Sequence, residues 1–454
     1  MKSEWVTIPL GDVLTLQRGH DLPTQNRLSG DIPILGSSGI TGFHNEAKAT
    51  GPGVTVGRSG NSMGEISYSD KDFWPLNTAL YVTDFKGNDP KFIYYLLKTI
   101  DFDQFNSGSA QKSLNRNAVY PFEVEIPKSR AEQQRISSVL SSLEEKVGIN
   151  QKINQTLEQM SQAIFKSWFV NFEPVKAKIA SLEAGESEED ALLAAMQAIS
   201  GTSLCNAGAS AAGAHAALTR LQAEQPERYA ELRATAELFP SAMQDSELGE
   251  IPEGWAYGTL SDIASFSRQR ISKDELTLET YISTENMLEN RKGVCPASSF
   301  PSSASVPGFE PGEILISNIR PYFKKIWLAN IHGGRSPDVL GFTPRHNGTE
   351  EHLFNLLYQD SFFEYMMLTS KGAKMPRGDK KAIMQFATAV PPIDLMRHFS
   401  EHVRPFYLLA TSHNRESVSL VSIRDTILPK LLSGELSVSS AEDQPAEAME
   451  TANV

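Results

Sequence analysis

Polar and basic side chains gather in glycine- and serine-rich segments that could present them to the base edges of DNA. Arg pairs with guanine, Asn and Gln pair with adenine, and glycine lets the backbone approach phosphate. In chain order the segments are 15–19, 57–61, 107–115, 265–270, 317–320 and 371–377. The residues in these segments whose side chains could meet a base edge or a phosphate are Arg18, Arg58, Ser59, Asn61, Ser109, Gln111, Lys112, Asn115, Arg268, Arg270, Asn318, Arg320, Lys371, Lys374 and Arg377. For each of them the alternative is a solvated surface side chain.

The chain carries no motif typical of an enzyme that methylates bases or hydrolyses nucleotides. A base methyltransferase needs an Asn/Asp-Pro-Pro-aromatic motif, but the only Pro-Pro pair stands in Val390-Pro391-Pro392-Ile393. Gly57 and Gly64 frame a glycine spacing without the lysine of a phosphate-binding loop. Cys205 and Cys295 are the only cysteines, which argues against a disulfide framework or a cysteine-based metal site. We therefore predict no catalytic residue, no metal site and no cofactor bound by this chain.

The net charge of −13 is concentrated outside the candidate DNA-contacting segments. Residues 171–250 carry 5 basic and 13 acidic residues, and residues 435–454 carry 5 acidic residues and none that is basic. Residues 251–392 carry 15 of each sign, so only a local basic face could meet phosphate. No run of ~20 apolar residues predicts a membrane span, and the N-terminus lacks the apolar core of a signal peptide. We expect a cytoplasmic protein.

An internal repeat organises the chain. The motif Trp-x4-Leu-x-Asp-Val/Ile occurs at 5–13 and again at 255–263, an offset of 250. The other matches are Pro-Gly at 52–53 and 311–312, Ile/Val-Pro at 126–127 and 390–391, and Asn150 with Asn414. Their offsets grow from 250 to 264 and then stay constant. The repeat predicts two copies of one module, with longer loops in the second.

Each copy begins with short apolar runs broken by Gly, Pro, Asn and Ser, which predict a mixed α/β domain. The expected strands are 54–56, 78–82 and 122–126 in the first copy, and 313–317 and 325–328 in the second. The segment 90–99 predicts a helix with Pro90 in its first turn. The matching helix of the second copy is expected over 350–369.

A long helical pattern follows each domain. Apolar and small residues recur at alternating spacings of about 3 and 4 from Ile136 to Trp168 and, less regularly, from Phe399 to Leu431. At ~1.5 Å per residue, ~40 residues extend about 60 Å, and such a helix has no core of its own. The two helices are therefore expected to pack as an antiparallel coiled coil. Pro405 should kink the second helix or mark its effective start.

The segment between the two copies has no counterpart at the C-terminus. It is rich in Ala and Glu, with expected helices near 187–199 and 215–237. We interpret it as a solvated, acidic helical linker. The end of the chain predicts disorder.

Three stretches resemble motifs of the specificity subunits of type I restriction-modification systems, the HsdS family. They are Ile164–Val170 with Phe172–Lys178, Asp245–Trp255, and Arg424–Leu436. Together with the repeat, the resemblance covers nearly the whole chain except the tail. It implies two target recognition domains, each reading one half of a split DNA site, and two conserved helices that space the halves. The fold class is then α+β, with two mixed α/β domains that are each followed by a long helix.

The resemblance also implies the boundaries and the partners. The expected parts are a first recognition domain over 1–130, a first helix over 131–171, the linker over 172–250, a second recognition domain over 251–392, a second helix over 393–436 and a tail over 437–454. The expected partners are double-stranded DNA, two methyltransferase subunits and restriction subunits. S-adenosylmethionine, ATP and Mg are then cofactors of those subunits.

Two features of the helices leave alternatives open. Phe165, Trp168, Phe169, Leu428 and Leu431 could dock a methyltransferase subunit, or the aromatic rings could cap the coiled coil internally. Asn150 and Asn414 could form a buried pair that fixes the helix register, or they could lie in a partly exposed seam.

Two other classes of protein stay as alternatives. A fused methyltransferase-nuclease would show activity without partners, which the missing motifs disfavour. A helical scaffold or adaptor that binds no DNA is compatible with the charge count, and DNA-binding assays would separate it from a specificity subunit.

Overall fold

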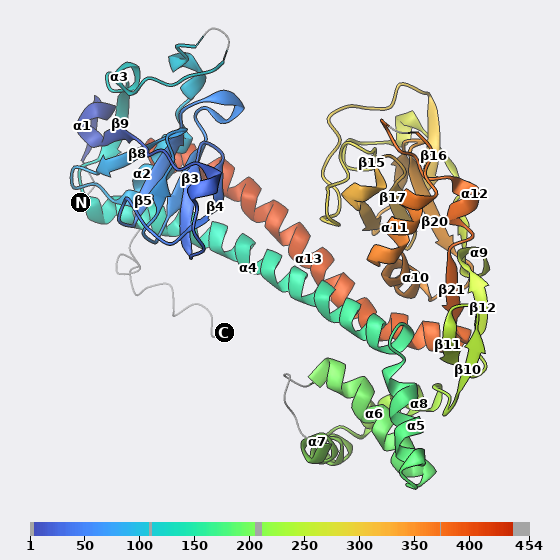
Figure 1. Ribbon diagram of the computed structural model, residues 1–454. Helices are drawn as coiled ribbons and strands as arrows, with labels where there is room; N and C mark the ends of the chain where they lie inside the picture. The colour runs from blue at the N-terminus through green and yellow to red at the C-terminus, as the bar shows by residue number, and fades with distance from the viewer. Residues whose placement is uncertain (1–3, 109–110, 205–210, 373, 439–454) are drawn as a thin grey trace, which may run out of the picture. The chain divides into compact units, whose positions relative to one another are not determined.

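The computed structural model describes residues 4–108, 111–204, 211–372 and 374–438. The chain divides into two compact units, which are described separately (Figure 1). The first unit combines residues 1–150 with 415–454, and the second spans residues 151–414. Each unit therefore contains one globular domain and one half of each long helix, so the units do not follow the expected domain boundaries, which remain predictions.

The globular domain of the first unit is built around a four-stranded antiparallel sheet in the order β2-β8-β5-β6. A second sheet, β4-β3-β7, and the two-stranded pair β1-β9 complete it. The strands are β1 (Trp5–Pro9), β2 (Thr15–Arg18), β3 (Ile32–Gly36), β4 (Gly39–His44), β5 (Gly53–Gly57), β6 (Ile66–Ser69), β7 (Trp74–Pro75), β8 (Ala79–Asp84) and β9 (Glu123–Pro127). The helices are α1 (Leu10–Val13), η1 (Thr24–Asn26), η2 (Gly60–Ser62), α2 (Pro90–Lys98), η3 (Phe102–Phe105) and α3 (Arg116–Val119).

The globular domain of the second unit repeats the four-stranded sheet in the order β13-β20-β17-β18. A second four-stranded sheet, β14-β16-β19-β15, and the pair β12-β21 accompany it. The strands are β12 (Ala256–Thr259), β13 (Ala264–Phe266), β14 (Arg270–Ser272), β15 (Tyr281–Ile282), β16 (Ser305–Phe309), β17 (Ile314–Ser317), β18 (Ile326–Leu328), β19 (Gly333–Arg335), β20 (Val339–Pro344) and β21 (Ala387–Val390). The helices are α9 (Leu260–Ile263), η4 (Lys273–Glu275), η5 (Pro321–Phe323), α10 (Glu350–Leu357), α11 (Asp360–Leu368) and α12 (Lys380–Ile383).

The repeated tryptophan motif has the same structure in both domains. In the first domain β1 begins at the tryptophan and pairs with the last strand, β9. In the second domain β12 begins one residue after the tryptophan and pairs with the last strand, β21. The leucine and the Val/Ile of the motif then lie on a one-turn helix, and all four side chains are buried: Leu10, Val13, Leu260 and Ile263. The motif thus closes each domain by joining its first and last strands.

Most expected elements are confirmed, and three are corrected. The helix expected over 350–369 is two helices, because the chain leaves the helical conformation at Gln359 (φ −64°, ψ 148°). The helix expected over 215–237 is also two, α7 (Ala211–Glu224) and α8 (Pro226–Glu237), with Pro226 starting the second. Pro405 does not mark the start of the last helix, since α13 (Ile393–Leu432) begins twelve residues earlier.

The two long helices, α4 (Arg130–Phe169) and α13, each contain 40 residues. In the first unit they run antiparallel, with Glu144 beside Arg424 and Asn150 beside Ser417. In the second unit the antiparallel pairing continues, with Asn154 beside Asn414. The expected antiparallel helix pair and the α+β fold class are confirmed.

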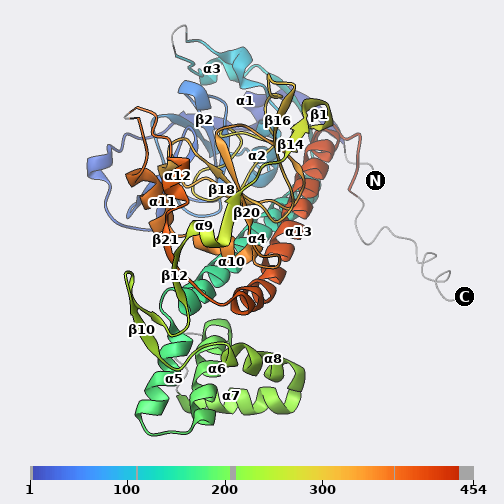
Figure 2. The ribbon, with the colours of Figure 1, turned by 90° about the vertical axis from the view of Figure 1, so that its right-hand side faces the viewer.

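The segment after α4 is a packed helical bundle, which corrects the interpretation as a solvated linker. Its helices are α5 (Glu173–Glu183), α6 (Glu188–Leu204), α7 and α8, and Figure 2 shows them grouped together. The bundle shares its buried core with the second domain. Phe239 packs edge-on against Trp168, with ring centroids 5.5 Å apart, and the ammonium of the buried Lys178 donates to the Phe239 carbonyl at 2.5 Å. A short hairpin, β10 (Met243–Ser246) with β11 (Gly249–Pro252), leads into the second domain.

His352 gives this core a pH dependence. Its ring lies 4.7 Å from that of Phe169 and 5.5 Å from that of Phe165, and burial lowers its pKa to about 3. Because an unfolded histidine titrates near 6.5, the unfolded chain binds more protons below that pH. The stabilising contribution is therefore complete above pH 6.5 and is lost as pH falls towards 3. We expect the unfolding free energy to fall by about 1.4 kcal/mol per pH unit from this residue in that window.

The variant His352→Phe should flatten this part of the pH profile, measured by urea unfolding between pH 7 and pH 5. His332, which is exposed, supplies the control variant His332→Gln, which should keep the wild-type slope. An unchanged slope in His352→Phe would contradict the assignment.

Candidate nucleic-acid interface

In the first domain the structure brings together the two segments 57–61 and 107–115. The Leu114 amide donates to the Arg58 carbonyl at 2.8 Å, and the Gly60 amide donates to the Lys112 carbonyl at 3.0 Å. Ser59 and Ser113 form a bridge between them. The first segment is anchored at the end of the buried strand β5, so two loops far apart in sequence form one surface.

The second domain joins its own two segments, 317–320 and 371–377, in the same way. The Gly378 amide donates to the Asn318 carbonyl at 3.3 Å, and the Arg320 amide donates to the Pro376 carbonyl at 2.9 Å. The donors and acceptors are the repeat equivalents of those in the first domain, with an offset of 260 for the first loop and 264 for the second. The repeat therefore preserves two backbone hydrogen bonds between the loops, although the side chains differ. We call the two surfaces the loop pairs.

The predicted residues of the first loop pair lie in different environments. Asn61 and Gln111 are exposed, and Arg58 and Ser59 are half-buried. Lys112 forms an exposed ion pair with Asp103 at 2.6 Å. The side chain of Asn115 caps α3 by accepting from the Asn117 amide at 3.0 Å. Ser109 lies outside the described residues.

Three of the predicted residues of the second loop pair, Asn318, Lys371 and Arg377, are buried or paired within the protein. Asn318 is only 6% exposed, so its side chain lies inside the domain. Arg377 pairs with Asp338 at 3.1 Å. Lys371 pairs with Asp379 at 2.5 Å, and its hydrogen bond helps to lower the pKa of that carboxyl to about 2. Lys374 is exposed.

Three further predicted residues lie near the first strand of each domain's main sheet: Arg18 ends β2, Arg268 follows β13 and Arg270 begins β14. Arg18 lies 4.0 Å from Asp21 in an exposed pair, and Arg268 is exposed. Arg270 donates to the Ser305 carbonyl at 2.8 Å. Among the described residues, no backbone hydrogen bond joins these three arginines to the loop pairs.

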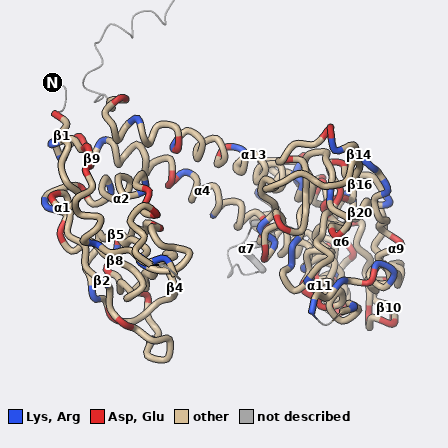
Figure 3. Tube along the Cα trace, turned by 90° about the horizontal axis from the view of Figure 1, so that it is seen from above, with Lys and Arg blue, Asp and Glu red and all other residues tan. Residues whose placement is uncertain are grey.

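Two basic residues of this surface were missed by the sequence analysis. Lys380 and Lys381 are exposed on α12, directly after the second loop pair. With them, residues 371–381 contain five basic residues and one acidic residue. Figure 3 shows that Lys/Arg and Asp/Glu positions are by contrast interspersed along α4 and α13. The signal was present in the sequence, because the basic run continues past Arg377.

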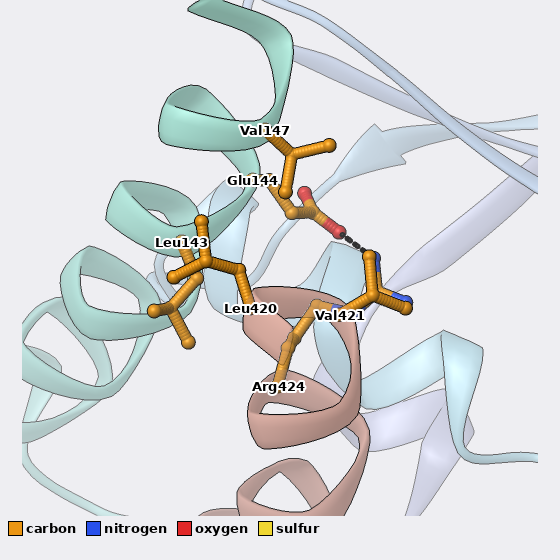
Figure 4. A pocket seen from close by; sticks show the side chains of 6 residues that line it. All are labelled: Leu143, Glu144, Val147, Leu420, Val421 and Arg424. Carbon is orange, nitrogen blue, oxygen red and sulfur yellow. Dashed lines mark hydrogen bonds and ion pairs between the residues drawn. The ribbon is translucent and has the colours of Figure 1, made fainter. Parts of the chain in front are cut away.

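A polar junction connects the first domain to both long helices. The Tyr95 hydroxyl on α2 donates to Glu144 on α4 at 2.9 Å, and Arg424 on α13 donates to the same carboxylate at 3.1 Å (Figure 4). Lys98 adds a third contact at 3.1 Å. Burial and the neighbouring carboxylate raise the pKa of Tyr95, so the hydroxyl stays a donor.

The second domain has a neutral junction at the equivalent positions. Asn355 on α10 donates to the Tyr407 hydroxyl on α13 at 2.8 Å, and the Ser161 hydroxyl on α4 donates to the Asn355 side chain at 3.0 Å. Asn355 is the repeat equivalent of Tyr95 at an offset of 260. Within the helices the buried positions match at an offset of 263, as Ile136 with Phe399 and Leu140 with Val403, which corrects by one residue the offset of 264 taken from Asn150 and Asn414. At this offset Tyr407 and Arg424 correspond to Glu144 and Ser161. Each domain is therefore attached to both helices at one shared position, with different chemistry.

The aromatic residues expected to dock a partner subunit lie in the core of the chain itself. Phe165 and Trp168 are 1% exposed, and Phe169 is 9% exposed. Leu431 is buried and Leu428 partly buried against the core of the first domain. These side chains close the junction between helix ends and domains, which corrects the docking prediction for the three aromatic rings.

The two asparagines of the seam do not pair with each other. Asn150 is fully buried and donates to Glu416 at 2.8 Å and to Ser417 at 3.3 Å. Asn414 is exposed and accepts from Asn154 at 2.9 Å. Of the two alternatives, a partly exposed polar seam fits Asn414, while Asn150 is a buried polar group whose amide nitrogen donates across the helix pair.

Within the described ranges, no helix is long and apolar enough to cross a membrane. In the same ranges no three His, Cys, Asp or Glu side chains are grouped so that they could hold a metal ion.

The first copy of the repeat matches a known family, and most of the chain is similar to known proteins. The family described as "Type I restriction modification DNA specificity domain" matches residues 2–159. The HindI specificity subunit of Haemophilus influenzae is 27% identical over 401 residues, covering 84% of this chain and 85% of that protein. The MjaIX specificity subunit of Methanocaldococcus jannaschii is 22% identical over 373 residues, covering 77% and 69%.

A crystal structure of the type I restriction-modification S subunit from M. genitalium shares the fold. It aligns with a TM-score of 0.52 at 16% identity, covering 95% of this chain and 96% of that one. The family match in the first copy, relatives that span most of the chain and a shared fold agree with the domain-helix repeat. The first copy matches the family model, and over most of its length the chain is similar to specificity subunits of type I restriction enzymes.

Proposed function

We propose that this chain selects the DNA sequence on which a type I restriction-modification complex acts, with each globular domain reading one half of a bipartite site. The observation that carries the proposal is the duplicated loop pair. In both domains two backbone hydrogen bonds join the same two loops. These loops carry polar side chains of the types that read base edges.

The two halves of the site should differ in sequence. At equivalent positions the first domain offers the half-buried Arg58 and no side chain at Gly60, whereas in the second domain Asn318 is buried and Arg320 is half-buried. Because direct readout depends on the donors and acceptors of the side chains, such different sets favour different bases. The site is therefore asymmetric.

The helix pair should set the distance between the two half-sites. Each of α4 and α13 runs without interruption from one compact unit into the other, and each has 40 residues. A helix of this length extends about 60 Å, and half-sites one turn of duplex apart lie ~34 Å centre to centre. A stiff connection of fixed length converts helix length into a spacing.

The chain itself supplies recognition, and partner subunits supply the chemistry. We propose double-stranded DNA, two methyltransferase subunits and restriction subunits as its partners, acting in the cytoplasm. S-adenosylmethionine, ATP and Mg then belong to those partners. The buried aromatic residues at the end of α4 leave the exposed surfaces of the helices for docking.

Methylome sequencing tests the central claim. A host that expresses this chain with its methyltransferase subunits should acquire adenine methylation at one split motif, with one methylated adenine in each half. A matched host that expresses the methyltransferase subunits alone should show no such motif. A complex that binds or methylates DNA without sequence preference would favour the alternative of a scaffold that does not read DNA.

The basic segment of the second domain should contribute to phosphate binding. Replacing Lys374 and Lys380 with alanine should weaken DNA binding by a similar factor for cognate and unrelated duplexes. The slope of log K against log salt should fall by about 1.8, since each phosphate contact contributes about 0.9. Binding titrations of the assembled complex at several salt concentrations measure this slope.

The double variant Lys176→Ala and Arg220→Ala is the matched control, because it removes two exposed cations from the helical bundle of the same unit. It should leave the slope unchanged. Equal slopes in the two double variants would show that residues 371–381 do not contact DNA phosphates.

Lengthening both helices should widen the gap in the recognised motif. A matched insertion of two turns, seven residues, in α4 and in α13 adds about 10 Å, which corresponds to about three base pairs. Methylome sequencing should return unchanged half-sites with a longer gap. An unchanged gap would show that the helices do not set it.

A further inference from the structure

The turn that follows the central strand of each recognition domain has the same backbone in both copies but different residues. In the first domain it contains Gly60 and Gly64, with φ of 77° and 87°. In the second domain the equivalent positions, 260 residues later, are Arg320 and Lys324, with φ of 51° and 50°. Both turns enclose a short 3-10 helix, η2 in the first domain and η5 in the second. The left-handed conformation is thus kept where glycine has been replaced by long basic side chains.

Left-handed backbone is unfavourable for residues with a Cβ atom, and glycine would avoid this penalty. Such conformations persist where the surrounding structure imposes them, and they concentrate at functional sites. The turn is held by a neighbouring loop whose residues Asn290 and Arg291 are also left-handed, with φ of 55° and 63°. Their amides donate to the carbonyls of Phe323 and Lys324 at 2.8 and 2.9 Å. We therefore expect the side chains of Arg320 and Lys324 to form contacts that glycine could not form.

The side chain of Lys324 forms such a contact within the protein. Its ammonium lies 2.7 Å from the carboxylate of Asp360, which also accepts from Arg291. These two cations lower the pKa of Asp360 to about 2. The side chain of Lys324 therefore ties the turn to helix α11.

Arg320 has no comparable partner. In the part of the chain that the structure describes it forms no ion pair, and its buried Nε has no hydrogen-bond acceptor. Its backbone is nevertheless fixed, because its amide donates to the Pro376 carbonyl within the second loop pair. The guanidinium is held at the base of the basic segment 371–381 without a protein acceptor.

An exposed aromatic residue stands beside it. Tyr322 is 48% exposed, and its ring packs on that of Phe323 with centroids 4.6 Å apart. The equivalent residue in the first domain is Ser62. A half-exposed tyrosine fixed by a neighbouring ring, next to an arginine without an acceptor, suits contact with a nucleotide better than contact with water.

We propose that Arg320 and Tyr322 together form the base-reading tip of the second recognition domain. Arg320 donates its planar fork to the O6 and N7 atoms of one guanine in the major groove, and Tyr322 contacts the adjacent nucleotide. The proposal rests on the proposed function. The first domain has glycine, Gly60, at the position of Arg320, so it has no side chain there. The contact therefore belongs to one half-site only.

The test uses the full chain assembled with its methyltransferase subunits and reads the methylated motif of each variant. Arg320→Gly should relax one position of one half-site and leave the other half-site intact. Its melting temperature should not fall, because the substitution also removes the left-handed penalty. Arg320→Lys keeps the charge but loses the fork, so it should relax the same position. Tyr322→Ala should weaken methylation of the same half-site.

Lys324→Gly is the matched control. It also places glycine at a left-handed position of the same turn and removes one positive charge. In the wild type, however, the Lys324 side chain is paired with Asp360. The recognised motif should stay unchanged in this variant.

The outcomes separate the two proposals. A wild-type complex without a split motif would contradict the proposed function itself. A wild-type split motif that Arg320→Gly leaves unchanged would overturn the assignment of Arg320 alone. Full specificity in Arg320→Lys would show a phosphate contact in place of base reading, and a large fall in melting temperature with loss of both half-sites would show a structural role. Either result also overturns the proposal.

Discussion

A helix of 40 residues cannot bury its own apolar stripe, and the rest of this structure follows from how that stripe is covered. In the first unit, Ile136 and Leu140 of α4 enter the core of the first domain together with Leu431 and Leu432 of α13. In the second unit the other ends of the same helices enter the core of the second domain, through residues such as Trp168 and Phe399. Each domain therefore buries the beginning of the helix that follows it and the end of the other helix. Neither half of the chain has a complete core without a segment of the other half.

The two polar junctions make this arrangement specific. The partly buried carboxylate of Glu144 accepts from Arg424 on the other helix and from Lys98 of the first domain, and it would lose the first of these cations if the wrong helix end lay opposite. The other junction places Ser161 opposite Tyr407, which is neutral and needs only hydrogen bonds. Exchanging the helix ends would place Arg424 beside uncharged groups and leave Glu144 facing Ser161. Because a partly buried charge is less stable when it loses a partner of opposite charge, the different chemistry of the junctions favours pairing of unlike copies over pairing of like ones.

The sequence predicted those features that repeat or that follow a period. The helices α4 and α13 were found from their apolar spacing, and the duplicated sheets from short apolar runs and the recurring tryptophan motif. The break between α10 and α11 was missed because no glycine or proline marks it, and tertiary packing at Tyr358 and Gln359 decides it. The burial of Phe165 and Trp168 was left open, since an aromatic cluster at a helix end looks the same whether a partner or the chain itself covers it. The left-handed turn at Arg320 had no signal, because glycine is the usual mark of such a turn and here it is absent.

The loop pairs show how such a scaffold can change its specificity without changing its fold. The hydrogen bonds that join the loops, Leu114 to Arg58 and Gly378 to Asn318, run between backbone atoms. Backbone groups are present whatever the side chain is, so the loops can exchange side chains while their relative position is kept. The exceptions are positions where the backbone restricts the residue. At Gly64 a Cβ atom would lie 2.7 Å from that of Phe102, whereas at Gly60 the nearest atom would be 3.6 Å away. Space for a side chain therefore exists at the position equivalent to Arg320, and the main barrier to placing one there is the conformational penalty that the second domain already accepts.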